Sequence, residues 1–275
     1  MSRWIPQRMK RNLFLLAATL LMMLILTPNS GWSWGPLGHR VAAAMAQERL
    51  TPAATAAVRD IFGKKIRLAD ISTWADEQQE IPESRAWHFV NVPIQAARYD
   101  PKYCPPEGCV VSKIKEFKRI LQDPRTDKRL KQEAVKFLIH LIADLHQPLH
   151  VGDNGDKGGN LLQVRFFGIG SNLHKVWDSQ VIERHTKYEN VWLWDMDFIA
   201  NPGKVKEWSK GTPEDWATET LQVAKAAYRL PGTGRVMKSG VKLGNEYNSF
   251  ALPIIQVQLA KAGIRTAFVL NEIFK

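Results

Sequence analysis

The chain has 275 residues and a formal net charge of +11, with 45% hydrophobic and 24% charged residues. This composition is typical of an ordinary globular protein with enough apolar residues for a sizeable core, and the length is compatible with one domain. A basic surface suits a polyanionic partner, but it also serves solubility alone, so the charge by itself excludes neither.

The first 33 residues have the pattern of a secretory signal. Four cations and no acid precede the apolar run LFLLAATLLMMLIL, and the small residues Gly31 and Ser33 follow it. The run is shorter than the roughly 20 residues that a membrane span needs. We therefore expect a signal peptide at 1–33 and a mature domain at 34–275 with net charge +7, because the removed segment carries four of the positive charges. A retained N-terminal anchor is the alternative.

Helical patterns follow the predicted mature start. Residues 38–50 have apolar side chains at helical spacing, and Thr51-Pro52 indicates the start of a second helix, since proline is tolerated in a first turn. Residues 86–93 are a short strand candidate. Export implies an oxidising compartment, so we expect Cys104 and Cys109 to form a small-loop disulfide. A zinc site made from this pair alone is less favoured because the chain has no other cysteine.

The second half of the chain is also mostly helical. Residues 127–146, 212–230 and 251–274 are predicted helices, the second with a helix-start signature at its first residues. Residues 160–168 are the other strand candidate. We find no internal repeat and no low-complexity linker. The expected fold is a single mainly α domain, a helical bundle with at most a small β-hairpin.

Two His-x-x-x-Asp pairs stand out among the predicted helices. His140 and Asp144 are four residues apart and so project from one helical face, and His174 and Asp178 have the same spacing. Pro148 ends or kinks the first helix, which can turn His150 toward the same place. Imidazole nitrogens and carboxylates are the normal ligand set for zinc, so the spacing predicts metal binding.

Other residues add to this pattern with less weight. His39, Asp76 and His88 are of ligand type, although a histidine taken alone is more often a hydrogen-bonded core or surface residue than a ligand. His146 points away from the His140 and Asp144 face and is expected to be a packing or outer-sphere residue. The loop GDNGDKGGNLLQV could bring backbone amides to an anion or be a simple turn.

Taken together, the motifs resemble the S1/P1 nuclease family of zinc-dependent, single-strand-specific nucleases. They are WGPLGHR, WAD, WHFVNVP, HLIADLHQPLH, GGN, NLHKVWD and QLAKAGIRTAFVLNEIF, and they extend in order over nearly all of residues 34–275. The resemblance implies a mainly α-helical domain that holds three Zn²⁺ ions in a cleft. It also implies cleavage of phosphodiester and 3′-phosphomonoester bonds.

The resemblance also implies how the ligands are divided. One zinc would be held by Asp76, His88, His140 and Asp144, and a second by His150, His174 and Asp178. The third would be held by His39, by Asp144 as a bridge, and by the free amino group and carbonyl of Trp34. Removal of the signal would then complete the site, because a nitrogen inside a peptide bond cannot be a ligand.

Catalytic roles follow from the same resemblance. Asp144 would bridge the zinc pair at the attacking water, which Asp76 would orient or deprotonate, and the other zinc would stabilise the leaving 3′ oxygen. The products would carry a 5′-phosphate or, from 3′-nucleotides, would be nucleoside and phosphate.

Substrate contacts are implied at Phe89, Asn91, Gly159 and Asn160. Phe89 stands where the family places a base-stacking aromatic, although a core phenylalanine is the alternative. Asn91 stands where relatives can have aspartate, so base preference could differ because asparagine both donates and accepts. Asn160, after Gly158 and Gly159, is placed to bind the scissile phosphate.

One departure from the family pattern concerns charge. Many relatives have arginine at the position of Gln79, so a cationic contact is missing or is supplied elsewhere, with Arg85 as a candidate. The expected substrates are single-stranded DNA, RNA and 3′-nucleotides, and the expected protein is a periplasmic or secreted monomer without stable membrane insertion. The alternatives are a zinc-dependent phospholipase C of the same fold, in which a glutamate is expected at Asp178, and a non-catalytic zinc- or nucleic-acid-binding protein.

Overall fold

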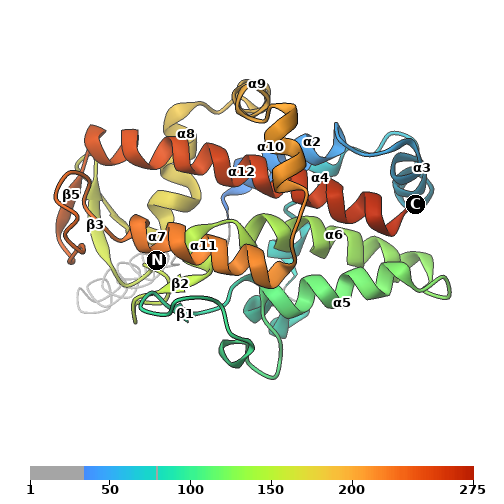
Figure 1. Ribbon diagram of the computed structural model, residues 1–275, viewed down its shortest axis with the longest axis horizontal. Coiled ribbons are helices and arrows are strands. Elements are labelled where there is room, and N and C mark those ends of the chain that lie inside the picture. Colours follow the sequence, from blue (N-terminus) through green and yellow to red (C-terminus); the bar gives the residue numbers. More distant parts are fainter. Residues whose placement is uncertain (1–33, 79) are drawn as a thin grey trace, which may run out of the picture. The chain divides into compact units, whose positions relative to one another are not determined.

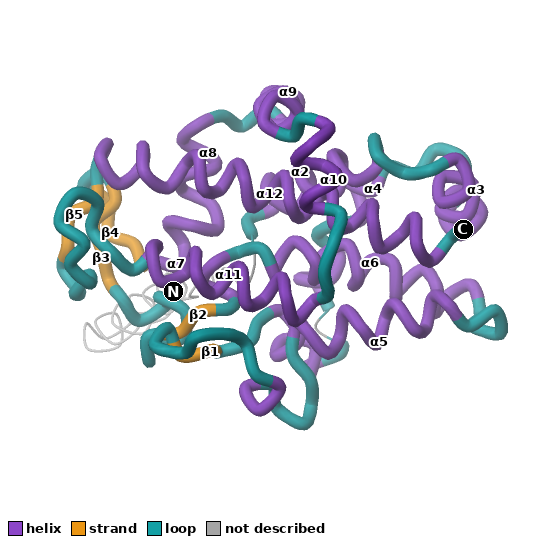
Figure 2. Tube along the Cα trace, viewed as in Figure 1, coloured by secondary structure: helices purple, strands orange, loops and turns teal. Residues whose placement is uncertain are grey.

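The computed structural model describes residues 34–78 and 80–275; the predicted signal segment and Gln79 lie outside the described residues. The described chain is mainly helical, with two small sheets toward one side (Figures 1 and 2). No helix in this part of the chain is both long and apolar enough to cross a membrane.

The α-helices are α2 (Pro36–Gln47), α3 (Pro52–Phe62), α4 (Leu68–Ile71), α5 (Val110–Gln122), α6 (Lys128–Leu145), α7 (Leu173–Lys175), α8 (Val181–His185), α9 (Glu189–Ile199), α10 (Pro202–Trp208), α11 (Pro213–Ala227) and α12 (Asn245–Ile273). Short 3₁₀ turns are η1 (Trp74–Glu77), η2 (Pro82–His88), η3 (Pro101–Tyr103) and η4 (Pro148–His150), and η5 (Val176–Gln180) is a π-helical turn. The strands are β1 (Val92–Pro93), β2 (Gly152–Asp153), β3 (Gln163–Phe166), β4 (Ile169–Asn172) and β5 (Val241–Leu243).

Side-chain caps explain where the predicted helices begin. The Thr51 side chain accepts a hydrogen bond from the N–H of Ala54 at the start of α3, and Asp127 does the same for Leu130 at the start of α6. Thr212 begins α11 in a reciprocal capping box with the residue three positions later. Each cap satisfies backbone N–H groups that a first helical turn leaves unpaired. The helices expected from the sequence are confirmed in these regions.

The C-terminal helix starts earlier than the sequence indicates. α12 begins at Asn245 and continues through Pro253. Its first turns are held by Tyr247, whose buried hydroxyl donates to the Ala227 carbonyl at 2.6 Å and accepts from the Trp177 indole at 2.8 Å. These tertiary contacts hold the turns before Pro253, where proline removes one backbone hydrogen bond of the helix.

The sheets match one strand prediction and correct the other. The candidate at 160–168 forms β3, which pairs antiparallel with β4 in a hairpin and parallel with β5. The candidate at 86–93 is mostly wrong: Pro82 starts a 3₁₀ turn that ends at His88, and only Val92 and Pro93 pair with β2. Trp87 in this turn packs its ring against aromatic rings of α5 and α6, which the strand pattern did not reveal.

α6 lies between two hydrophobic cores. Most of its buried side chains join the core formed with α3 and α5, while Ala143 joins the core formed with α2, η5 and α12. α2 in turn packs tightly on α12: a Cβ at Gly263 would lie 2.9 Å from the Ala42 carbonyl oxygen. The polar face of α6 is therefore enclosed from several sides, and this face carries His140 and Asp144.

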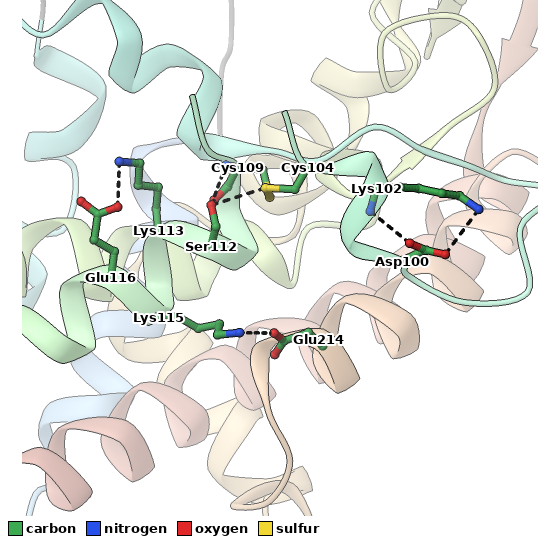
Figure 3. The surroundings of a disulfide bond; sticks show 9 residues. All are labelled: Asp100, Lys102, Cys104, Cys109, Ser112, Lys113, Lys115, Glu116 and Glu214. Carbon is green, nitrogen blue, oxygen red and sulfur yellow. Dashed lines mark hydrogen bonds and ion pairs between the residues drawn. A yellow bond between two sulfur atoms is a disulfide. The ribbon is translucent and has the colours of Figure 1, made fainter. Parts of the chain in front are cut away.

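The disulfide predicted between Cys104 and Cys109 is present (Figure 3). Cys109 is the residue before α5, and its N–H and carbonyl both bond to the Ser112 hydroxyl. Lys115 of α5 forms an ion pair with Glu214 at the start of α11. The next residue after Cys109, Val110, donates its N–H to the Phe89 carbonyl at 3.3 Å. The disulfide loop therefore leads into the first residue of α5, which is hydrogen-bonded to the residue after His88.

His146 lies outside the ligand clusters, in a buried polar network. Its Nδ1 donates to the Ile142 carbonyl at 2.7 Å, and its Nε2 accepts from Arg265 Nη1 at 2.8 Å. Burial, together with the Arg265 cation, lowers the pKa of His146 to about 3, so the ring is neutral. Arg265 also donates to Glu219 at 2.6 Å, and Lys261 pairs with the same carboxylate. The network joins α6, α11 and α12.

We expect Glu219→Gln to lower the free energy of unfolding by about 1 kcal/mol near neutral pH, because this carboxylate is partly exposed and solvent screens its ion pairs. Burial raises the pKa of Glu219, but Arg265 and Lys261 more than offset this and hold it below its usual value. Stability from Glu219 is therefore present above the usual carboxyl pKa and is lost as pH falls through the lowered one.

Denaturant unfolding across this pH range measures the effect. The difference between the parent protein and Glu219→Gln should shrink toward zero in acid. Glu207→Gln, which removes an exposed pair with Lys204, is the matched control and should change stability little at any pH. A difference that stays constant into acid would contradict the assignment of the effect to the Glu219 charge.

Candidate metal centre

The side chains predicted as ligands come from elements throughout the chain. α2 carries His39, η1 carries Asp76, η2 ends with His88, α6 carries His140 and Asp144, η4 ends with His150, α7 carries His174 and η5 carries Asp178. All of these side chains are at most 7% exposed except Asp76, which is 30% exposed. The clusters they form therefore reach solvent at Asp76.

Asp144 is the centre of the first cluster. Its Oδ2 lies 2.9 Å from His88 Nδ1 and 3.2 Å from His140 Nε2, and these two ring nitrogens are 3.0 Å apart. Asp76 Oδ1 lies 3.4 Å from His140 Nε2 and 3.7 Å from His88 Nδ1. The four residues that the resemblance assigns to one zinc ion are thus brought together.

His39 and His150 reach the other oxygen of Asp144. His39 Nε2 lies 3.4 Å from Asp144 Oδ1, and its ring stacks on His140 with 3.8 Å between centroids. His150 Nδ1 lies 3.5 Å from the same oxygen. One carboxylate therefore touches four imidazoles, which is the geometry a bridging ligand requires.

The second cluster is formed by His150, His174 and Asp178. His174 Nε2 lies 3.1 Å from Asp178 Oδ2, and His150 Nε2 lies 3.7 Å from Asp178 Oδ1. The two imidazoles stack with 5.0 Å between centroids. The four-residue spacing of His174 and Asp178 does place both side chains on one face, although the helix changes from α to π between them.

Trp34 lies between these two clusters. Its side chain is fully buried, and its indole Nε1 donates to the carbonyl of Ala143, the residue before Asp144, at 2.8 Å. The N–H of the next residue, Gly35, donates to the Asp178 carbonyl at 2.8 Å. Folding therefore brings residue 34 next to the segments of Asp144 and Asp178, more than 100 residues away in the chain.

Backbone carbonyls set the orientation of three imidazoles. The Nδ1 atoms of His140, His150 and His174 each donate a hydrogen bond, and the acceptors are the carbonyls of Ser72, His88 and Gly158, at 2.7, 2.9 and 2.7 Å. A carbonyl only accepts, so Nδ1 must carry the proton. Nε2 of each neutral ring is then a lone pair that points at the carboxylates, which is the tautomer a metal ligand needs.

The electrostatics of the first cluster favour a cation. Burial lowers the pKa of His140, but Asp144 and Asp76 outweigh this and raise it well above its usual value. Burial raises the pKa of Asp144, but His140 and His150 outweigh this and hold it well below its usual range. Burial and the neighbouring His140 lower the pKa of His39. The buried carboxylate thus demands a positive charge, and a metal ion would take the place of the proton on His140.

The donor atoms fit metal ions. Among the described residues, Asp144 Oδ1, His150 Nε2 and Asp178 Oδ2 are buried without a hydrogen bond, which is costly unless another partner binds them. Two ligand atoms of a tetrahedral zinc at about 2 Å lie about 3.3 Å apart. The separations within both clusters are close to this value. Three groups of side chains could therefore hold metal ions here, and two of them share His140: His39, Asp76 and His140; His88, His140 and Asp144; and His150, His174 and Asp178.

The predicted substrate residues Phe89, Asn91, Asn160 and Arg85 are all at least partly exposed. Phe89 follows His88, is half-buried and is extended, and Asn91 is exposed. Asn160 is half-buried, and its side-chain amide donates to the Lys157 carbonyl at 2.9 Å. Arg85 is exposed on η2, and Gln79 lies outside the described residues.

The glycine-rich loop proves to be closed on its own acids. Asp153 Oδ1 accepts from the N–H groups of Asp156 and Gly158, and Asp156 Oδ1 accepts from the N–H of Gly159 at 2.7 Å. These amides are already hydrogen-bonded and are not free to bind an anion. Of the two alternatives predicted for the loop, the simple turn is therefore the one observed. Its contribution is to place the Gly158 carbonyl on His174.

Sequence reasoning missed Gln147. This residue is fully buried, its Nε2 donates to Asp178 Oδ1 at 2.5 Å, and its Oε1 accepts from the N–H of Leu149. It therefore fixes the Asp178 carboxylate and the turn that leads to His150. A glutamine directly before Pro148 gave no periodic signal, so the sequence did not indicate its contact with Asp178.

Comparison with known proteins agrees with this geometry. The family model for S1/P1 nuclease matches residues 34–275. The chain belongs to the S1/P1 nuclease family. Endonuclease 3 of Arabidopsis thaliana is 30% identical over 283 residues, covering 93% of this chain and 94% of its own. Nuclease S1 of Aspergillus oryzae (strain ATCC 42149 / RIB 40) and nuclease P1 of Penicillium citrinum are each 28% identical, covering 88% and 87% of this chain and 92% and 97% of their own.

Membership in this nuclease family makes the chain a hydrolase that acts on phosphodiester bonds of nucleic acids. The resemblance inferred from the sequence motifs is confirmed, and the phospholipase alternative is not favoured. The mainly α fold with small sheets is the fold expected for the S1/P1 nuclease family.

We expect Gly158→Ala to weaken zinc binding at His150, His174 and Asp178 by about 10- to 100-fold, the range for removal of an outer partner of a metal ligand. Gly158 has φ +60°, and a Cβ there would lie 2.2 Å from the Leu149 carbonyl oxygen, so the carbonyl that orients His174 must move.

Gly155→Ala is the matched control, because Gly155 also has a positive φ of +78° but nothing within 4 Å of an added Cβ. Competition of each variant with a zinc chelator measures the affinity. Equal zinc affinities of the two variants would show that the Gly158 carbonyl does not support the cluster.

Proposed function

We propose that this S1/P1 nuclease is a zinc-dependent phosphodiesterase that cleaves single-stranded DNA and RNA to 5′-phosphorylated products and also removes phosphate from 3′-nucleotides. The observation that supports this most directly is the pair of buried clusters that meet at Asp144. Attack and departure in phosphoester hydrolysis occur on opposite sides of one phosphorus, and two adjacent cation sites can serve both oxygens.

We further propose that three zinc ions bind per chain. Asp76, His88, His140 and Asp144 would hold one, and His150, His174 and Asp178 another. His39, Asp144 and the terminal amine and carbonyl of Trp34 would hold the third, which the buried position of Trp34 next to Ala143 supports. Zinc at these residues would lower the pKa of a bound water toward neutrality and neutralise charge on the phosphate.

Among the chain's own residues, Asp76 would orient the attacking water. Asp76 is the most exposed of the ligand set, so its carboxylate is the group that can meet both the attacking water and the phosphate. Its pKa lies below the usual value, because His140 and His39 outweigh the effect of burial. Asp76 therefore stays ionised, accepts a hydrogen bond from the water and orients it for in-line attack.

Other residues would position the nucleotide. Phe89 is extended directly after His88 and half-buried, which leaves its ring partly exposed beside the clusters for stacking on a base. Asn91 would contact the base edge, and Asn160 with Gly159 would contact the phosphate. The N–H of Gly159 already donates to Asp156, so a phosphate contact by Gly159 requires this hydrogen bond to be exchanged. Arg85 is a candidate for the cation that Gln79 does not supply.

We propose that the protein works as a monomer outside the cytoplasm, in the periplasm or after secretion. The signal pattern of residues 1–33 and the disulfide between Cys104 and Cys109 support export. The requirement for a free amine at Trp34 links the two proposals, because cleavage after Ser33 would both release the protein and create the ligand.

An activity panel tests the function. The mature chain 34–275 with zinc should hydrolyse single-stranded DNA, RNA and 3′-nucleotides, and a chelator should abolish every activity. Phosphatidylcholine should not be hydrolysed, because Asp178 stands where the phospholipase ligand set has a glutamate. Hydrolysis of the lipid with all nucleic acids left intact would refute the nuclease proposal, and zinc-loaded protein without any activity would favour a binding protein.

The N-terminal ligand has a separate test. A chain with an uncleaved methionine before Trp34 should bind about one zinc fewer than a chain that begins at Trp34, and should lose most activity. Elemental analysis gives the zinc content independently of activity, and circular dichroism checks that both chains fold. Equal zinc content in the two chains would remove Trp34 from the ligand set.

A further inference from the structure

The glycine-rich loop between β2 and β3 has a conformation that its backbone alone does not favour. Gly155, Lys157, Gly158 and Gly159 all have positive φ, between +58° and +81°. Glycine adopts this left-handed region readily, whereas a lysine there is disfavoured. Side-chain contacts must therefore hold the loop in place, and the held conformation is the one that directs the Gly158 carbonyl to His174.

One face of α11 supports this loop at two points. A Cβ at Gly152, directly before the loop, would lie 2.3 Å from the Ala224 side chain, so helix and chain are in direct contact there. One turn later, the Tyr228 hydroxyl donates to Asp156 Oδ1 at 2.6 Å. Residues four apart share a face of a helix. Ala224 and Tyr228 therefore support the chain together where α11 lies beside β2 (Figure 1).

Tyr228 is itself fixed in position. Its side chain is fully buried, its N–H donates to the Ala224 carbonyl at 3.2 Å, and its carbonyl accepts from the N–H of Met237 at 2.8 Å. Burial, together with the Asp156 carboxylate, raises the pKa of Tyr228, so the phenol keeps its proton and remains a donor. A buried phenol hydroxyl normally finds a hydrogen-bond partner, and here the partner is a carboxylate of the loop.

Asp156 connects Tyr228 to the backbone of the loop. The carboxylate oxygen that accepts from Tyr228 also accepts from the N–H of Gly159 at 2.7 Å. The preceding residue, Gly158, accepts from His174 Nδ1 at 2.7 Å through its carbonyl, and a Cβ at Gly159 would lie 3.2 Å from the His174 backbone nitrogen. The loop thus lies between Tyr228 and His174, and a shift of Asp156 would move the carbonyl that orients the imidazole.

We propose that Tyr228 is a positioning residue of the second cluster, which consists of His150, His174 and Asp178. Tyr228 acts through Asp156, because the phenol hydroxyl holds the carboxylate that fixes the loop. The loop carbonyl in turn fixes the tautomer and the ring orientation of His174. This proposal rests on the proposed function, since it concerns one of the zinc sites proposed above.

Tyr228→Phe tests the proposal, because it removes only the hydroxyl. It should weaken zinc binding at the second cluster about tenfold, the lower end of the range for loss of an outer partner of a metal ligand. Competition with a zinc chelator measures this affinity independently of activity. His174→Ala, which removes a ligand, identifies the zinc ion of this cluster. Tyr228→Phe should leave the affinity of the other zinc sites unchanged.

Variants of Asp156 test whether the effect passes through this carboxylate. Asp156→Asn keeps an oxygen that can accept from both Tyr228 and Gly159, so its zinc affinity should stay close to that of the parent. Asp156→Ala removes the acceptor and should weaken zinc binding at least as much as Tyr228→Phe. In the Asp156→Ala background, Tyr228→Phe should have no further effect. A further tenfold loss would show that Tyr228 does not act through Asp156.

Tyr99→Phe is the matched control. Tyr99 is also buried, and its N–H donates to the Thr218 hydroxyl of the same helix, α11. The control should keep the zinc affinity of the parent. Melting temperatures of the zinc-free proteins separate folding from positioning: if Tyr228→Phe lowers the melting temperature but keeps the zinc affinity, Tyr228 supports only the fold and the proposal is wrong. If Tyr228→Phe does not fold, an unchanged zinc affinity of Asp156→Ala overturns the proposal instead.

The outcomes distinguish this proposal from the proposed function. If the parent protein cleaves nucleic acid but Tyr228→Phe binds zinc as the parent does, the positioning role is wrong and the nuclease function stands. If the parent cleaves no nucleic acid but loses zinc affinity with Tyr228→Phe, the proposed function fails and the positioning role stands. If the parent binds no zinc at the second cluster, both proposals fail.

Discussion

Asp144 is a fully buried carboxylate. The residues around it must compensate its negative charge, and this requirement determines how the centre of the protein is arranged. An isolated buried carboxylate is very costly, so cationic or hydrogen-bonding partners must surround it. Four imidazoles do so, from α2, η2, α6 and η4. Their convergence explains why α6 lies between two cores, because only a helix enclosed on both sides can present one carboxylate to partners from so many segments.

Irregular segments perform the fine positioning around this helix. The 3₁₀ turn that ends at His88, the turn at Pro148 and the loop at Gly158 each provide either a ligand or the carbonyl that orients one. A regular helix uses its carbonyls internally, so carbonyls available for imidazole N–H groups come from places where regular structure stops. Much of the candidate metal centre is therefore built from segments that are not regular secondary structure.

Cation sites of this kind act on phosphoester bonds in general, and the surrounding surface decides which phosphoester is used. Phe89 is half-buried and Asn91 is exposed, and residues on the surface around a rigid scaffold carry specificity more often than its buried residues. Family membership therefore assigns the chemistry more firmly than it assigns the substrate.

Much of this protein could be derived from its sequence alone, because the relevant signals are local. Caps at Thr51, Asp127 and Thr212 predict helix starts, and the spacing of His140 and Asp144 predicts a shared face. The extra turns of α12 before Pro253 and the 3₁₀ turn at His88 were not predictable, because tertiary contacts outweigh local preference there.

Only the tertiary structure decided how separate segments combine. The helical phase of His146 predicted a residue outside the clusters, but only the structure shows that Arg265, 119 residues away, bonds its second ring nitrogen. Likewise Gln147 meets Asp178 and Trp34 meets Ala143 across long stretches of chain. Such contacts have no spacing to reveal them, because they arise when the hydrophobic cores pack and bring distant polar groups into the same dry interior.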